Sequence, residues 1–181
     1  TPVLSGILAG DSANVSLSAS GVSASFATAS NGTSKPVTVT GYSLTGSAAG
    51  NYELSQLTGL TANISASPST ITVVNPTGAV YGTDVSFAFT ASQDGSVAVT
   101  VDGAGSPLSS CSSVNVLANT AANCVWTPTS AGSHSVSVAF IPTSGDYVGS
   151  NAATTFTVGQ KALTITGVTA VNKPYDGNTT A

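Results

Sequence analysis

The sequence predicts an all-β protein made of two tandem β-sandwich-like domains. Apolar and polar residues alternate with a period of two in many short runs, which is typical of half-buried strands. The chain contains 29 Ser, 26 Thr and 19 Gly, and residues of these types separate the runs as turns. Leu, Glu, Lys, Gln and Met, the residues that favour helix surfaces, are scarce or absent.

The first domain is expected over residues 1–66, with five or six short strands. The alternation in Val15–Ser20 continues at Val22, Ala24 and Phe26 and resumes at Val37–Thr40. The pair Asn31-Gly32 between the last two runs predicts a hairpin-type turn. The pattern supplies no opening strand, so we expect this β domain to be incomplete by itself. The short polar segment Ser65–Ser69 then predicts a domain boundary.

The second domain is expected over residues 70–158. Seven short strands in about 90 residues are the pattern of an immunoglobulin-like sandwich. The pairs Asp94-Gly95 and Asp102-Gly103 predict turns on either side of one strand. The strands are expected around these apolar positions: Ile71 and Val73; Val85, Phe87 and Phe89; Val97, Val99 and Val101; Val114 and Val116; Cys124 and Trp126; Val136, Val138 and Phe140; Phe156 and Val158.

Two resemblances support this division. Ala79–Ala91 and Ala131–Ser150 resemble bacterial Ig-like repeats of the group 3 type. Lys35–Ile64, taken with the C-terminal segment 161–181, resembles the bacterial repeat named for its YDG motif, here Tyr175-Asp176-Gly177. Both resemblances imply large, repetitive extracellular proteins of the giant adhesin-like or filamentous-haemagglutinin type. Neither brings catalytic residues with it.

The C-terminal segment 161–181 is expected to be the opening strand and YDG turn of the next repeat's β domain. Read in sequence, NKPYDGNTTA followed by TPVLSGILAGD forms one continuous pattern. We therefore expect the 181 residues to be one period of a longer array, in which this segment completes the first domain of the next copy. We call the segment the inter-repeat strand; its expected site residues are Leu163, Ile165, Val168, Tyr175, Asp176 and Gly177.

The two cysteines, Cys111 and Cys124, can be a disulfide or two buried free thiols. A disulfide is the simpler interpretation, because no cluster of other metal ligands accompanies them in the sequence. It would close a short loop and stabilise the second domain by roughly 3 kcal/mol. A disulfide would also indicate an oxidising compartment.

Charge argues against two classes of partner. The net charge is −4, with three Lys and no Arg, whereas a nucleic-acid binder needs clustered positive charge. No apolar run approaches the length that spans a bilayer, so we expect no membrane insertion in this segment. Any export signal or anchor is expected outside it.

The sequence gives little support to an enzyme. His134 is the only His, and no Gly-x-Ser-x-Gly elbow surrounds any Ser. The seven acidic residues are scattered, and Asp94, Asp102 and Asp176 each precede a Gly, which favours a role in turns. No Asp-x-Asp-x-Asp spacing suggests a calcium loop. We therefore predict no catalytic, cofactor or metal site.

The expected function is a structural, adhesive extracellular or cell-surface repeat module that forms a rod, stalk or fibre. Its partners would be neighbouring copies joined head to tail, with surface glycans or matrix as a second class. One alternative is a non-covalent filament whose subunits exchange a donor strand. Another is a carbohydrate-binding module, for which Tyr52, Tyr147 and Tyr175 are the candidate contact residues.

Overall fold

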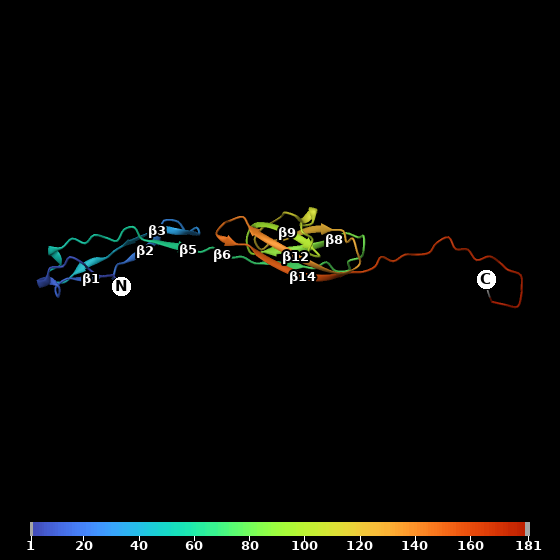
Figure 1. Cartoon of the computed structure of the whole chain (residues 1–181), viewed down its shortest axis with the longest axis horizontal. Helices are drawn as coiled ribbons and strands as arrows, with labels where there is room; N and C mark the ends of the chain where they lie inside the picture. Colours follow the sequence, from blue (N-terminus) through green and yellow to red (C-terminus); the bar gives the residue numbers. More distant parts are fainter. Residues whose placement is uncertain (1, 180–181) are drawn as a thin grey trace. The chain divides into compact units, whose positions relative to one another are not determined.

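The computed structural model describes residues 2–179. Within them the fold is all-β, as predicted from the sequence (Figure 1). The helical elements in this range are three short 3-10 turns, at Ala9–Asp11, Ala49–Asn51 and Ser109–Cys111. The chain forms two compact units: unit 1 comprises Thr1–Ser69 and Ser144–Val148, and unit 2 comprises Thr70–Thr143 and Gly149–Ala181.

Unit 1 contains small sheets of short strands. A two-stranded antiparallel sheet joins β1 (Ser16–Ser18) to β4 (Ser43–Thr45). A three-stranded sheet has the order β2-β3-β5, formed by Ser23–Phe26, Gly32–Thr40 and Thr61–Ile64. In addition, β6 (Ser67–Pro68), inside the expected boundary segment, pairs in parallel with β13 (Tyr147–Val148).

The hairpin-type turn predicted at Asn31-Gly32 is wrong. Strands β2 and β3 pair from Phe26 opposite Val37, so their connection is much longer than two residues. Gly32 instead begins β3 and pairs with Ile64 of β5. The Asn31 N–H donates a hydrogen bond to Oδ1 of Asp146 at 2.6 Å, so a contact distant in sequence overrides the local turn preference.

Unit 2 is a seven-stranded β-sandwich, which confirms the predicted sandwich class. One sheet has the order β11-β8-β7 and the other the order β10-β9-β12-β14, with antiparallel pairing throughout. The strands are β7 (Ile71–Val74), β8 (Val85–Ala91), β9 (Gly95–Val101), β10 (Val114–Val116), β11 (Ala121–Trp126), β12 (Gly132–Pro142) and β14 (Ser150–Val158).

The core of unit 2 lies between these two sheets. The period-two alternation turns every second side chain inward. The largest fully buried side chains are Phe87, Phe89, Phe140, Val97, Val99, Val136, Val138, Val158, Pro128 and Cys111. Phe87 of one sheet meets Phe156 of the other edge to face, with ring centroids 5.5 Å apart. Each large side chain buried in this way stabilises the fold by about 1.5–3 kcal/mol.

Two glycines of unit 2 are required by their positions. A Cβ at Gly95 would lie 2.3 Å from the carbonyl oxygen of Ile141, so only glycine allows β9 and β12 to approach this closely. Gly103 and its neighbour Asp102 both have left-handed backbone angles, with φ of 66° and 54°. This conformation produces the turn that the Asp-Gly pair predicts.

Candidate functional site

An open groove of about 340 Å³ lies in unit 1. We call it the unit 1 groove. Its apolar lining is Val3, Leu4, Ile7, Val15, Leu44 and Leu54, and its polar lining is Ser5, Tyr52, Glu53 and Ser55. A second hollow of about 100 Å³ shares Val3, Leu4 and Leu54 with the groove and adds Leu17 and Leu57.

The groove stays open because unit 1 buries very little apolar surface. Within the described part of this unit, the buried apolar residues are Val15 and Ala48. All four residues of β2 are exposed, including Phe26. A sheet needs a second layer opposite its apolar face to exclude water, and the described residues of unit 1 do not supply one for β2.

The rim of the groove is held by polar contacts. The hydroxyl of Tyr52 accepts a hydrogen bond from the Leu8 N–H at 3.1 Å and donates one to Oδ2 of Asp11 at 2.9 Å. These bonds tie the segment that carries Val3 to Ile7 to the other side of the groove. The groove is therefore a formed feature of unit 1, although its floor is partly open to water.

The inter-repeat strand, by contrast with the groove, has exposed apolar side chains. Residues 160–179 form no strand or helix in the described structure, and Figure 1 draws them as a plain trace leaving β14. Leu163, Ile165 and Val168 are 92%, 89% and 79% exposed. Within the described structure, the residues predicted to form a strand therefore pair with no other strand.

The YDG turn at the end of this segment is held by its own side chains. Nζ of Lys173 donates to Oδ2 of Asp176 at 3.0 Å and to Oδ1 of Asn178 at 2.8 Å. The Lys173 ammonium holds the pKa of the Asp176 carboxyl below its usual range. Gly177 has the left-handed φ of 76° that the turn requires, and Tyr175 is presented almost fully exposed.

His134 forms a buried polar contact that resembles part of a catalytic triad. Its Nδ1 lies 2.6 Å from Oδ2 of Asp102, and its Nε2 lies 3.1 Å from the carbonyl oxygen of Ser130. In a triad, Nε2 would instead face a nucleophilic hydroxyl. The ring of His134 also packs against Trp126 and Phe156. This geometry makes His134 a satisfied structural residue between β11 and β14.

Asp102 takes part in both the turn and this contact. Its Oδ1 accepts the Ser135 N–H at 2.9 Å while its Oδ2 faces His134. The hydrogen bond from His134, with that from Ser135, holds the pKa of Asp102 below its usual range. The sequence indicated only the turn, because nothing in the local pattern links Asp102 to a histidine 32 residues away.

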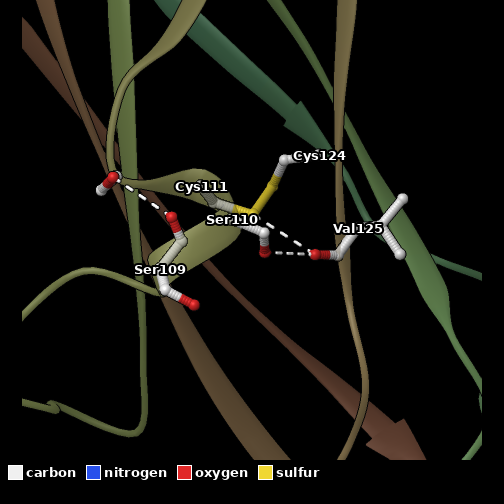
Figure 2. The surroundings of a disulfide bond; sticks show 6 residues. Ser109, Ser110, Cys111, Cys124 and Val125 are labelled. Carbon is white, nitrogen blue, oxygen red and sulfur yellow. Dashed lines mark hydrogen bonds between the residues drawn. A yellow bond between two sulfur atoms is a disulfide. The ribbon is translucent and has the colours of Figure 1, made fainter.

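The predicted disulfide is present. Cys111 and Cys124 are bonded with a Cα–Cα distance of 5.5 Å, and both are buried in the core of unit 2. The bond ties the 3-10 turn at Ser109–Cys111 to β11. Figure 2 shows Ser110 beside it, donating a hydrogen bond to the carbonyl oxygen of Val125 at 2.6 Å. This second contact holds the same turn against the same strand.

The tyrosines proposed for carbohydrate contact belong to different units. Tyr52 and Tyr147 are half-buried in unit 1, and the Tyr52 hydroxyl is already bonded there. Tyr175 lies in the inter-repeat strand and is 99% exposed. Carbohydrate-binding surfaces would need these rings in one row, and each unit by itself does not provide one.

Residues 2–179 contain no group of three or more His, Cys, Asp or Glu side chains placed to hold a metal ion. No helix within that range is long and apolar enough to cross a membrane.

Two features of the structure were not predicted from the sequence: the unit 1 groove and a side-chain contact of Asn75. The unit 1 groove depends on Val3, Leu4 and Ile7, which show no strand periodicity and form no strand. Asn75, which precedes a proline, has a side chain that reaches β14. Only the pairing of distant segments could reveal either feature.

Comparisons with known proteins give one family. The family model described as the YDG domain matches residues 1–62. Searches among curated proteins and among solved structures returned no match. The first third of this chain is therefore similar to the YDG domain family, as the resemblance of Lys35–Ile64 predicted.

Proposed function

We propose that this chain is a structural, adhesive extracellular repeat module that forms a rod, stalk or fibre. In this proposal the inter-repeat strand of one copy completes unit 1 of the next copy. The observation that carries the proposal is the coexistence of two complementary features in one chain. Unit 1 has an open groove lined by both apolar and polar side chains, and residues 160–179 hold apolar side chains that are largely exposed.

The energetics favour docking of the inter-repeat strand. Burying Leu163, Ile165 and Val168 would each contribute about 1.5–3 kcal/mol, which together is on the order of the whole stability of a small domain. A docked strand also pairs its backbone with an open sheet edge, which removes a site for aggregation. The edge strands of unit 1 offer such pairing: β1 and β4 beside the groove, and β2 and β5 in the three-stranded sheet.

Unit 2 would act as the rigid spacer between successive copies of unit 1. Its sheets, β11-β8-β7 and β10-β9-β12-β14, follow an order that supports the resemblance to Ig-like repeats. The buried disulfide supports an oxidising, extracellular location. The YDG match to residues 1–62 supports the repeat type expected for unit 1. No catalytic role is proposed for either unit.

Two routes can join the copies. In the first, the copies are continuous in one polypeptide. In the second, separate subunits exchange the inter-repeat strand and form an open filament. Denaturing electrophoresis distinguishes them: a ladder or one very large band supports the first, and a band near 17.5 kDa supports the second.

The proposal is tested by comparing one copy with two copies joined from Ala181 to Thr1. Hydrogen exchange should show that amides of β1 and β4 are more protected in the second copy than in the first. Replacing Leu163 and Ile165 by Asn should remove this protection. The matched control replaces Thr164 and Thr166, on the opposite side of the strand, by Asn. Equal exchange in the two copies would contradict the proposal.

A further inference from the structure

Unit 2 begins and ends with segments that run side by side in the same direction. The chain enters the unit at β7 and leaves it after β14. Val80, in the connection after β7, forms a parallel bridge with Gly159, directly after β14. The Gly159 N–H donates to the Ala79 carbonyl oxygen at 2.8 Å, and the Tyr81 N–H donates to the Gly159 carbonyl oxygen at 2.9 Å.

Asn75, which precedes Ala79–Tyr81 in the sequence, also joins the entering segment to the leaving segment. Its Nδ2 donates to Oγ1 of Thr154 and to the carbonyl oxygen of Thr155, both at 2.8 Å. The partners are separated by 79 and 80 residues in sequence. The entering segment is thus fixed to the leaving segment at two places, by a side chain at Asn75 and by the backbone at Ala79–Tyr81. We call these contacts the first-to-last strand contact.

The direction of these segments decides how the contact responds to tension. Pulling on both ends of the chain draws the entering segment toward its N-terminus and the leaving segment toward its C-terminus. Because the two segments are parallel, these forces point in opposite directions along the same line. All four hydrogen bonds are then loaded in shear together. An antiparallel pair pulled from one end would instead open one bond after another.

We propose that the first-to-last strand contact is a mechanical clamp that sets the force at which unit 2 unfolds. This inference rests on the proposed rod function for its biological meaning, because a rod transmits tension through each unit. The clamp itself is a property of one copy, so it can be tested whether or not copies join. Polar side chains outside the core, such as Asn75, would then set the force that unit 2 withstands.

The test pulls the full 181-residue chain by its two ends with optical tweezers. The disulfide identifies which event is the unfolding of unit 2. With Cys111 and Cys124 bonded, the 12 residues between them stay hidden. Reduction should lengthen this event by about 40 Å, at 3.3–3.6 Å per residue. The unit 1 event should keep its length.

Two variants weaken the clamp without touching the core. Asn75→Ala removes both side-chain bonds to β14, and at constant force we expect unit 2 to unfold about tenfold faster. Tyr81→Pro removes the donor to Gly159, with the same expected direction. Trp126 fluorescence checks that each variant is folded before pulling. If Tyr81→Pro does not fold, Asn75→Ala alone decides the result.

The matched control is Asn115→Ala, because Asn115 is exposed on β10, at the other edge of the same sheet. In this variant, the lifetime of folded unit 2 under constant force should equal that in the unchanged chain. The proposal is overturned if Asn75→Ala unfolds as slowly as the unchanged chain, or if Asn115→Ala shortens the lifetime equally. Failure of copies to join in solution would overturn the proposed function and leave the clamp standing.

Discussion

Reduction of the Cys111–Cys124 disulfide should destabilise unit 2 strongly. The two residues are 13 apart in sequence. In the chain-entropy account, a crosslink that closes a loop of this size stabilises the fold by about 3 kcal/mol. For a domain of 60–100 residues, each kcal/mol changes the melting temperature by about 4–8 °C. The expected fall in the melting temperature of unit 2 is therefore about 12–24 °C.

Trp126 makes this measurement specific to unit 2. It is the only Trp in the chain, it lies two residues after Cys124, and its ring packs against Phe87 and Phe156. Its fluorescence therefore reports the core next to the disulfide. Thermal unfolding should be followed with and without reductant. Hydrogen exchange of the β1 amides follows unit 1 in the same sample and should not change.

A chain with Cys111→Ala and Cys124→Ala provides the control for side effects of the reductant. This variant should melt low and should not respond to reductant. The reasoning is refuted if the unchanged chain melts at the same temperature in both conditions. It is also refuted if reductant lowers the melting temperature of the Ala variant as much as that of the unchanged chain.

Three further perturbations test the local structure. Gly95→Ala places a Cβ 2.3 Å from the Ile141 carbonyl oxygen, so we expect a loss of about 1–3 kcal/mol in urea unfolding; an unchanged urea midpoint would contradict this. The pKa of Asp102 is lowered by its hydrogen bond with His134, so its contribution to stability is complete above about pH 4 and is lost as the pH falls through the lowered pKa. Melting between pH 6 and pH 2 should show this loss, and Asp102→Asn should reduce it. Tyr52→Phe removes two hydrogen bonds at the rim of the unit 1 groove. We expect unit 1 to lose about 1 kcal/mol of stability per bond, which faster amide exchange in unit 1 would report. The melting temperature of unit 2 should stay the same.

The sandwich of unit 2 could be predicted because its sequence satisfies both local and distant requirements. Long runs such as Val85–Ala91 and Gly95–Val101 alternate strictly, and two sheets of such runs cover each other's apolar faces. The strand propensity and the burial therefore agree. The disulfide was predicted on a different ground, because no cluster of other metal ligands accompanies the two cysteines in the sequence.

The polar contacts of unit 2 could not be predicted in this way. Asp102 and Asn75 each occupy a local context, before Gly and before Pro, that is explained by a turn alone. Their partners are decided by which strands lie side by side. His134 is 32 residues from Asp102, and Thr154 is 79 residues from Asn75. A period-two pattern specifies which side of a strand is apolar, but it does not specify the neighbouring strand.

In unit 1, some residues form a strand without being buried, and this observation supports the proposed docking. The alternation around Ala24 and Phe26 correctly predicted a strand, yet Phe26 is 39% exposed because no layer of the described unit covers it. The inter-repeat strand has the reverse property: Leu163 and Ile165 alternate as in a strand but have no sheet to join. Each segment has the pattern of a half-buried strand and lacks the half that buries it. If natural sequences keep local pattern and final environment consistent, the docking to a neighbouring copy that we propose would restore this consistency in both segments. Phe26 should then lose much of its exposure in the second copy of a tandem chain.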